Sequence, residues 1–247
     1  LIVHGATPFM SLSKSLWVLL GATSIVFHLS LIFSGLVPNL VSRPLHMALA
    51  LPWVFLFASQ GLMSRISGAI FSIIGIACCL FIVLNESALS DQYGYLSGSL
   101  QTAVAGALLL IVLEMARRAI SWPLPLVAGL ALVYGIWGQH LPGEFGHPGL
   151  PLQSFLGTLV ITEGGLWGKL TGISVSIVAI FVIFGAVLNA GEAGQGFMNL
   201  ATAAAGRLKG GAAKVSVLSS ALFGSISGSN FTFSVLRSFC ISFLSFL

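Results

Sequence analysis

Gly210-Gly-Ala-Ala-Lys-Val-Ser-Val-Leu-Ser-Ser-Ala-Leu-Phe-Gly-Ser-Ile-Ser-Gly-Ser-Asn230 is an apolar stretch that closes in a cluster of glycine and serine. As a helix, its apolar part from Ala212 to Phe223 would reach about 18 Å, a little over half of the roughly 30 Å hydrocarbon layer of a bilayer. Irregular backbone at that depth is tolerated only beside protein or a water-filled cavity, as in the broken helices of transporters. The stretch therefore predicts the first half of a re-entrant hairpin.

The composition around this stretch is that of an all-α polytopic membrane protein. Hydrophobic residues make up 57% of the 247 residues, charged residues make up 6%, and the mean hydropathy is +1.04. Soluble domains carry about 25% charged residues. The net charge of +4 comes from basic residues scattered singly between apolar runs. This spacing favours membrane lipids over nucleic acid as the partner of the basic residues.

Six stretches have about the length of 20 apolar residues that a transmembrane helix needs. They are residues 16–36, 45–63, 67–84, 98–116, 120–137 and 170–190. Pro38 and Pro44 are interpreted as breakers between the first two. Residues 192–208 have apolar side chains at helical spacing, which predicts an interfacial arm helix that leads into the hairpin.

The basic residues predict the orientation of these helices. With the N-terminus in the cytoplasm, seven of them fall inside: Lys14, Arg65, Arg117, Arg118, Arg207, Lys209 and Lys214. Only Arg43 and Lys169 then fall outside, together with most of the acidic residues. Because cytoplasmic loops carry an excess of Lys and Arg, this distribution indicates a cytoplasmic N-terminus.

A change in composition near residue 119 suggests two modules. Residues 1–119 are expected to form a compact four-helix membrane module. Residues 120–230 are expected to begin a transport module with two spans, the arm helix and the half hairpin. Residues 231–247 form a divergent tail rich in Phe and Ser.

The glycine and serine cluster is a candidate ion or substrate site. A helix that ends at Phe223 or Gly224 leaves its last carbonyl groups without partners, and its dipole places partial negative charge there. The predicted site comprises Gly224, Ser225, Ser227, Gly228, Ser229 and Asn230, with the three serines as sodium ligands. An oxygen-only site without a carboxylate suits a hard monovalent ion. The alternative is a helix-packing surface of small residues.

Few other residues could carry chemistry. No acidic side chain is expected at membrane depth in the second module, which favours sodium over protons as the coupling ion. No organic cofactor is expected. Glu114 is expected to form an interfacial ion pair with Arg117 and Arg118. His28 is expected to hydrogen-bond a neighbouring helix, and a role as a proton relay is the alternative.

Two further segments have competing interpretations. Residues 147–168 are too polar to span a membrane. They predict either an interfacial helix capped by Gly164 and Gly165 or a re-entry element that anchors the sixth span through Trp167, an aromatic residue of the kind enriched at membrane interfaces. Ser227-Gly228 could suggest an intramembrane serine protease with His28 or His46 as base. The surrounding sequence lacks the Gly-x-Ser-Gly spacing of rhomboid proteases, so the chain is not expected to be an enzyme.

Seven strings resemble, in order, the fused permeases of tripartite ATP-independent periplasmic (TRAP) transporters. They are Arg43-Pro-Leu-His46, Leu113-Glu-Met-Ala-Arg-Arg118, Leu141-Pro-Gly143 with His147, Thr162-Glu-Gly-Gly-Leu-Trp-Gly168, Phe184-Gly-Ala-Val-Leu188, Gly206-Arg-Leu-Lys-Gly-Gly211 and Phe223-Gly-Ser-Ile-Ser-Gly-Ser229. The most similar branch is the one served by TAXI-type solute-binding proteins.

The resemblance implies a small four-helix module fused to an elevator-type module in a bacterial inner membrane. Such permeases use a sodium gradient to import a carboxylate that a periplasmic binding protein delivers. The matching serine-rich string forms the tip of the first hairpin there, beside sodium and substrate, which implies this role for Ser225, Ser227, Gly228 and Ser229.

The tail departs from the family pattern. After Asn230 the family continues with a return helix and a second hairpin, and residues 231–247 resemble neither. A shifted reading frame or a truncated gene would produce such a tail. We therefore expect that this polypeptide alone does not transport, and the alternative function is a non-transporting membrane scaffold or a truncated remnant.

Overall fold

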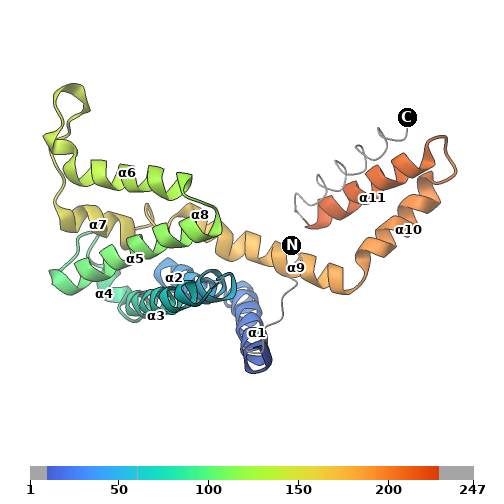
Figure 1. Cartoon of the computed structure of the whole chain (residues 1–247), viewed down its shortest axis with the longest axis horizontal. Coiled ribbons are helices and arrows are strands. Elements are labelled where there is room, and N and C mark those ends of the chain that lie inside the picture. The colour runs from blue at the N-terminus through green and yellow to red at the C-terminus, as the bar shows by residue number, and fades with distance from the viewer. Residues whose placement is uncertain (1–9, 60, 228–247) are drawn as a thin grey trace. The chain divides into compact units, whose positions relative to one another are not determined.

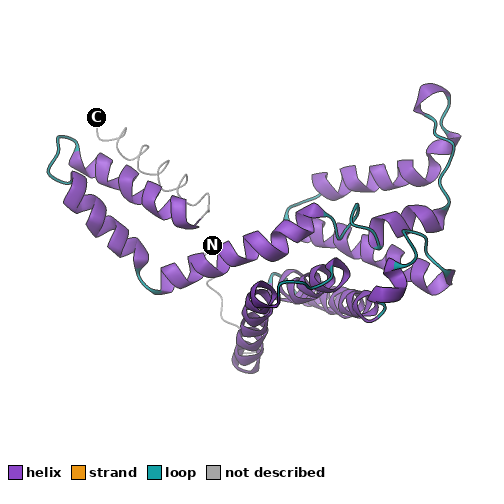
Figure 2. Ribbon diagram, turned by 180° about the vertical axis from the view of Figure 1, so that it is seen from behind, coloured by secondary structure: helices purple, strands orange, loops and turns teal. Residues whose placement is uncertain are grey.

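The structure is a computed structural model that describes residues 10–59 and 61–227, and helices are the only regular secondary structure over these residues (Figures 1 and 2). This confirms the all-α polytopic fold. The chain divides into two compact units, Leu1–Ser176 and Ile177–Leu247, which are described separately. The predicted division into modules near residue 119 stays a prediction. The two compact units are defined by the contacts within each of them, and such contacts do not test the boundary between family modules.

The helices follow one another along the chain with short connections. In the first unit they are α1 (Met10–Ser34), α2 (Asn39–Pro52) with a π-helical turn (Trp53–Phe57), α3 (Leu62–Leu84), α4 (Glu86–Ser90), α5 (Gly98–Ala119), α6 (Pro123–Trp137), 3₁₀ turns at Gly138–His140 and Gly143–Phe145, α7 (Leu152–Val160) and α8 (Lys169–Ile173). A second π-helical turn (Ser174–Val178) leads into the second unit, which holds α9 (Ala179–Ala190), α10 (Ala193–Ala205) and α11 (Gly211–Ser227).

Five of the described helical segments are long and apolar enough to cross a membrane. They are Lys14–Ser34, Asn39–Phe57, Leu62–Leu84, Gly98–Ala119 and Lys169–Leu188. The expected span at 120–137 is the shorter helix α6, whose 15 residues reach about 22 Å. Near its end α6 packs closely on α7, because a Cβ at Gly135 would lie 2.5 Å from the nearest ring carbon of Phe155.

The second span begins six residues earlier than the sequence predicts. Pro44 lies buried inside α2 and does not break it. Proline is tolerated in membrane helices where neighbouring groups satisfy the freed carbonyl. The helix ends with a π-helical turn, in which the Ala58 N–H donates to the Trp53 carbonyl at 3.1 Å. The second span therefore ends at Phe57, before the expected limit at residue 63. Gly61, with φ +91°, is the N-cap of α3.

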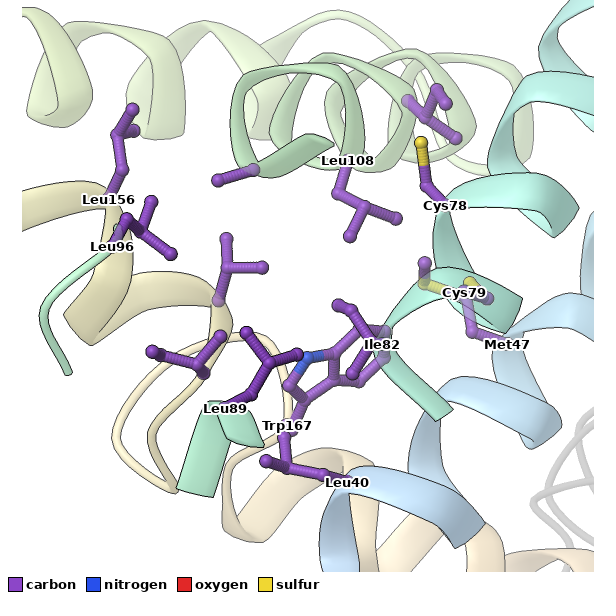
Figure 3. Close-up of a cluster of buried hydrophobic side chains, with 14 of the residues drawn as sticks. Leu40, Met47, Cys78, Cys79, Ile82, Leu89, Leu96, Leu108, Leu156 and Trp167 are labelled. Carbon is purple, nitrogen blue, oxygen red and sulfur yellow. The ribbon is translucent and has the colours of Figure 1, made fainter. Parts of the chain in front are cut away.

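The core of the first unit lies between α2, α3, α5 and α7 (Figure 3). Trp167 is only 1% exposed and packs there among leucine and isoleucine side chains. The Trp167 indole therefore fills the protein core, and its role as an anchor of the sixth span stays a prediction. Cys78 and Cys79 lie in the same core as free thiols, and Cys240 lies outside the described residues.

The loops of the first unit fall into two groups by their contacts. At one end, α7 packs so closely on the loop before α5 that a Cβ at Gly157 would overlap the Gly94 carbonyl, and Asn39 donates to Glu163. At the other end, Arg118 donates to the Ser64 carbonyl at 3.2 Å. These two groups of loops are expected if consecutive spans alternate in direction. Helix α6 then connects the group that contains Arg118 with the group that contains α7.

Candidate functional site

The second unit contains a helical hairpin formed by α10 and α11, which lie side by side and antiparallel (Figure 1). Small side chains line the contact: Ala201 is fully buried, and Ala205, Val215 and Ser219 are at most 8% exposed. Small residues let the backbones of membrane helices approach closely, and van der Waals contacts then hold the pair. The hairpin is therefore held by close helix packing.

Glycines form the turn between the two helices. Gly210 has φ +70°, a left-handed conformation that glycine adopts without steric cost. A Cβ at Gly206 would lie 2.5 Å from the Thr202 carbonyl oxygen, and one at Gly211 would overlap the Gly206 carbonyl. The turn thus explains the string Gly206-Arg-Leu-Lys-Gly-Gly211 physically: only glycine fits three of its positions.

Basic side chains surround this turn. Arg207, Lys209 and Lys214 are exposed at the end where α10 passes into α11. Positive charge near a membrane surface attracts anionic lipid headgroups, by about 1 kcal/mol for each Lys or Arg. This end of the hairpin is therefore suited to an anionic membrane surface.

Helix α11 is longer than the sequence predicts. The sequence predicts an end at Phe223 or Gly224, whereas the helix continues to Ser227 and its 17 residues reach about 25 Å. Gly and Ser are weak helix formers, but in an apolar environment a broken backbone costs more than a poor helix residue. The prediction of the helix end is therefore wrong by about one turn.

The longer helix changes which backbone groups form the candidate ion site. The last four carbonyl groups of a helix lack intrahelical partners, and in α11 these belong to residues 224–227. Gly224, Ser225 and Ser227 therefore lie in the last turn, at the negative end of the helix dipole. Gly228, Ser229 and Asn230 lie outside the described residues. The binding role of all six residues stays a prediction.

The predicted arm helix corresponds to α10. It begins after Glu192, which has the left-handed φ of +56°, and ends at Ala205. Ala201, on the predicted apolar face, is buried against α11, whereas Leu200 and Leu208 are 64% and 53% exposed. The helix is therefore a partner of α11, and its position along a membrane interface stays a prediction.

A chain of hydrogen bonds links three membrane helices in the first unit. His28 Nδ1 lies 2.6 Å from the Ser24 carbonyl oxygen, and its Nε2 lies 2.8 Å from His46 Nδ1. His46 Nε2 lies 3.1 Å from the Ser174 hydroxyl, in the π-helical turn after α8. The prediction that His28 hydrogen-bonds a neighbouring helix is confirmed.

One assignment of protons satisfies every member of this chain. Ser174 donates to His46, His46 donates to His28, and His28 donates to the Ser24 carbonyl, with both imidazoles neutral. Each ring then uses one nitrogen as donor and the other as acceptor. The role of His28 as a proton relay stays a prediction. Sequence reasoning missed Ser174, whose only signal was its place in the apolar run at 170–190.

The predicted ion pairs of Glu114 are present. Arg117 makes two hydrogen bonds to this carboxylate, at 2.6 and 2.7 Å, and Arg118 makes one at 2.7 Å. Arg118 also donates to Ser67 Oγ at 3.0 Å and lies 5.0 Å from the ring centroid of Phe55. Arg118 therefore ties α5 to α3 and to the end of the second span, which the sequence did not predict.

No group of three or more His, Cys, Asp or Glu side chains that could hold a metal ion occurs among the described residues. Charged and hydroxyl groups gather instead in two cavities on the loop side that contains Asn39. One, of about 320 Å³, is lined by Arg43 and Lys169. The other, of about 540 Å³, is lined by Glu86 and Glu163.

Comparison with known proteins gives one family. Residues 107–235 match the family model described as the tripartite ATP-independent periplasmic transporter, DctM component. This match spans more than half of the chain and includes the whole hairpin of α10 and α11. No curated protein and no solved structure matches.

Proposed function

Because the chain belongs to the DctM component family of TRAP transporters, we propose that it is a permease part of a sodium-coupled secondary transporter that imports a carboxylate. The family is one of transporters, and the five candidate spans place the chain in a membrane. The carboxylate and the solute-binding protein of TAXI type rest on the resemblance described above, and sodium rests on that resemblance and on the chemistry of α11.

The hairpin of α10 and α11 is the observation that carries this proposal. It lies within the residues that match the family, and its second helix ends in a turn that contains Gly224, Ser225 and Ser227. Free carbonyl groups and hydroxyl oxygens without a carboxylate suit Na⁺ better than a divalent or transition metal. Gly228, Ser229 and Asn230 would complete the set of oxygen ligands.

The solute-binding protein would dock on the loop side that holds Asn39, Glu163 and Gly94. This side carries the predicted outer loops, whereas Arg118 and the Arg207 turn carry the predicted cytoplasmic charge. The resemblance implies a bacterial inner membrane, and the positive-inside distribution supports a cytoplasmic N-terminus. Orientation can be read from whether an added cysteine at Glu144, in the exposed loop after α6, reacts with an impermeant maleimide in intact cells.

Sodium-dependent uptake into proteoliposomes tests the ion site. In a permease with both hairpins present, Ser227→Leu should abolish sodium-dependent uptake, because a bulky apolar side chain would displace the ion from the last turn of α11. Ala212→Leu, at an exposed position in the first turn of the same helix, is the matched control. Unchanged sodium dependence in Ser227→Leu would remove the site assignment.

A second candidate function is a non-transporting membrane scaffold. It is favoured by the first unit, which has its own buried core and its own polar bridges between helices. Sodium-driven uptake by proteoliposomes that depends on this chain would exclude the scaffold function.

A further inference from the structure

The cavity of about 320 Å³ at one end of the first unit is lined by two basic side chains and no acidic one. It lies where the end of α1, the start of α2 and α8 with its following turn come together. Its polar lining consists of Asn39, Ser42, Arg43, Lys169 and Ser176, with no acidic residue among the residues that line it. A small polar cavity with two cationic side chains and no anion in its wall attracts an anionic ligand.

The guanidinium of Arg43 is held in place and has donors to spare. One of its terminal nitrogens donates to the Trp167 carbonyl. The other terminal nitrogen would lie 3.0 Å from a Cβ at Gly172, so the guanidinium rests against the bare backbone of α8. Among the described residues its remaining N–H groups have no hydrogen-bond partner. Arginine offers five donors in a fixed fork that matches a carboxylate or a phosphate.

No acidic side chain lines this cavity to neutralise the two basic ones. Both ion pairs in the described part of the chain belong to Glu114. Glu163 accepts a hydrogen bond from Asn39 and lines the neighbouring cavity, together with Glu86. The charges of Arg43 and Lys169 are therefore not neutralised by a salt bridge within the part of the chain that the structure describes.

The hydrogen bonds that join His28, His46 and Ser174 lie about one helical turn from this cavity and connect its three walls. Leu31 on α1 follows His28 by three residues, and Ser42 on α2 precedes His46 by four, so each lies on the same helix face as its histidine. Ser174 belongs to the third wall. The hydrogen bonds among these three elements hold the cavity open before a ligand arrives, which lowers the entropy cost of binding.

We propose that this cavity binds an oxyanion, a carboxylate or a phosphate group, through a bidentate contact with Arg43 and a second contact with Lys169. The site shares no residue with the candidate ion site of α11 and does not depend on the proposed transport function. An oxyanion of this chemistry could come from a free carboxylate solute, from inorganic phosphate or from the headgroup of a phospholipid.

Binding to the purified full chain in detergent tests the proposal, with succinate, inorganic phosphate and phosphatidylglycerol as separate probes. Thermal stabilisation reports the two soluble anions, and native mass spectrometry reports retained phosphatidylglycerol. Arg43→Gln should weaken binding of the true ligand at least about tenfold, since a charge-assisted bidentate contact is lost. Lys169→Gln should weaken it less, because this side chain is exposed.

Two further variants separate charge from fold. Arg65→Gln removes an exposed positive charge at the opposite group of loops and should leave binding unchanged. Gly172→Ala keeps both charges but places a methyl group against the guanidinium, and should weaken binding of the same probe. Binding of only phosphatidylglycerol would identify a lipid site, and binding of only succinate or phosphate would identify a solute site. Absence of Arg43-dependent binding for all three probes would overturn the proposal.

Discussion

Arg118 and Arg117 contact the same carboxylate, yet their contributions to stability should differ severalfold. The Arg118 side chain is 12% exposed and donates to Ser67 and Ser64 on α3 as well as to Glu114. Arg117 is 33% exposed and, among the described residues, donates only to Glu114, while its guanidinium lies 5.2 Å from the ring centroid of Trp122. Comparing the two alanine variants therefore separates the bridge between helices from the ion pair itself.

The expected magnitudes follow from these contacts. A hydrogen bond to a charged group contributes about 1.5–3 kcal/mol, and a partly desolvated cation–π contact about 1 kcal/mol. Because α3 can shift and water can reach the released acceptors, we expect Arg118→Ala to lower the free energy of unfolding by about 3 kcal/mol. An exposed ion pair contributes about 0–1 kcal/mol, so Arg117→Ala should lower it by at most about 1 kcal/mol.

Reversible unfolding in mixed micelles of a mild detergent and sodium dodecyl sulfate, followed by tryptophan fluorescence, measures both free energies. A double-mutant cycle between Arg118→Ala and Ser67→Ala should give a coupling energy of about 1 kcal/mol, because the two side chains bond directly. The same cycle with Arg117→Ala should give none. Equal losses for the two arginine variants would refute the bridging role assigned to Arg118.

Three further predictions concern packing, the histidine chain and the cysteines. Gly68→Ala should destabilise the first unit by about 2 kcal/mol or more, since its Cβ would overlap the Phe55 carbonyl. Gly106 has open space around it, so Gly106→Ala should be neutral or slightly stabilising. Thermal unfolding of both variants measures this difference. His46→Ala should lower the free energy of unfolding by about 1–2 kcal/mol, because two hydrogen bonds between helices are lost. His140 is exposed after α6, so His140→Ala should change this free energy very little. Equal unfolding temperatures of the two variants would contradict the hydrogen bonds assigned to His46. Cys79, fully buried, should resist maleimide until the protein unfolds, and rapid labelling located by mass spectrometry would show that the core is open.

Much of the fold could be predicted from local properties of the sequence. Long apolar runs predict helices because every backbone polar group in a bilayer must find a partner within its own segment. The errors lie at helix ends. The sequence predicts a break at Pro44, which lies inside α2, and an end of α11 at Phe223 or Gly224, whereas this helix continues to Ser227. In both cases an apolar environment outweighs a weak local propensity.

The candidate site could be predicted only in part. Gly206, Gly210 and Gly211 form a recognisable string, and the structure shows that the string is a tight turn between two packed helices. The oxygen-rich end of α11 also follows from residue types. The cavity beside Arg43 could not be predicted, because the sequence signal of Arg43 and Lys169 was only that both were expected on the outer side.

The sequence by itself determined that this chain is a helical membrane protein, where most of its helices run, and which transporter family it resembles. Only the tertiary structure decided which polar side chains meet between helices. His46 lies 18 residues from His28 and 128 from Ser174, and their contact depends on the rotation and packing of three helices. Local helix propensity and hydropathy fix where a helix forms, but the face that it turns toward its neighbours is set by side-chain packing over the whole unit.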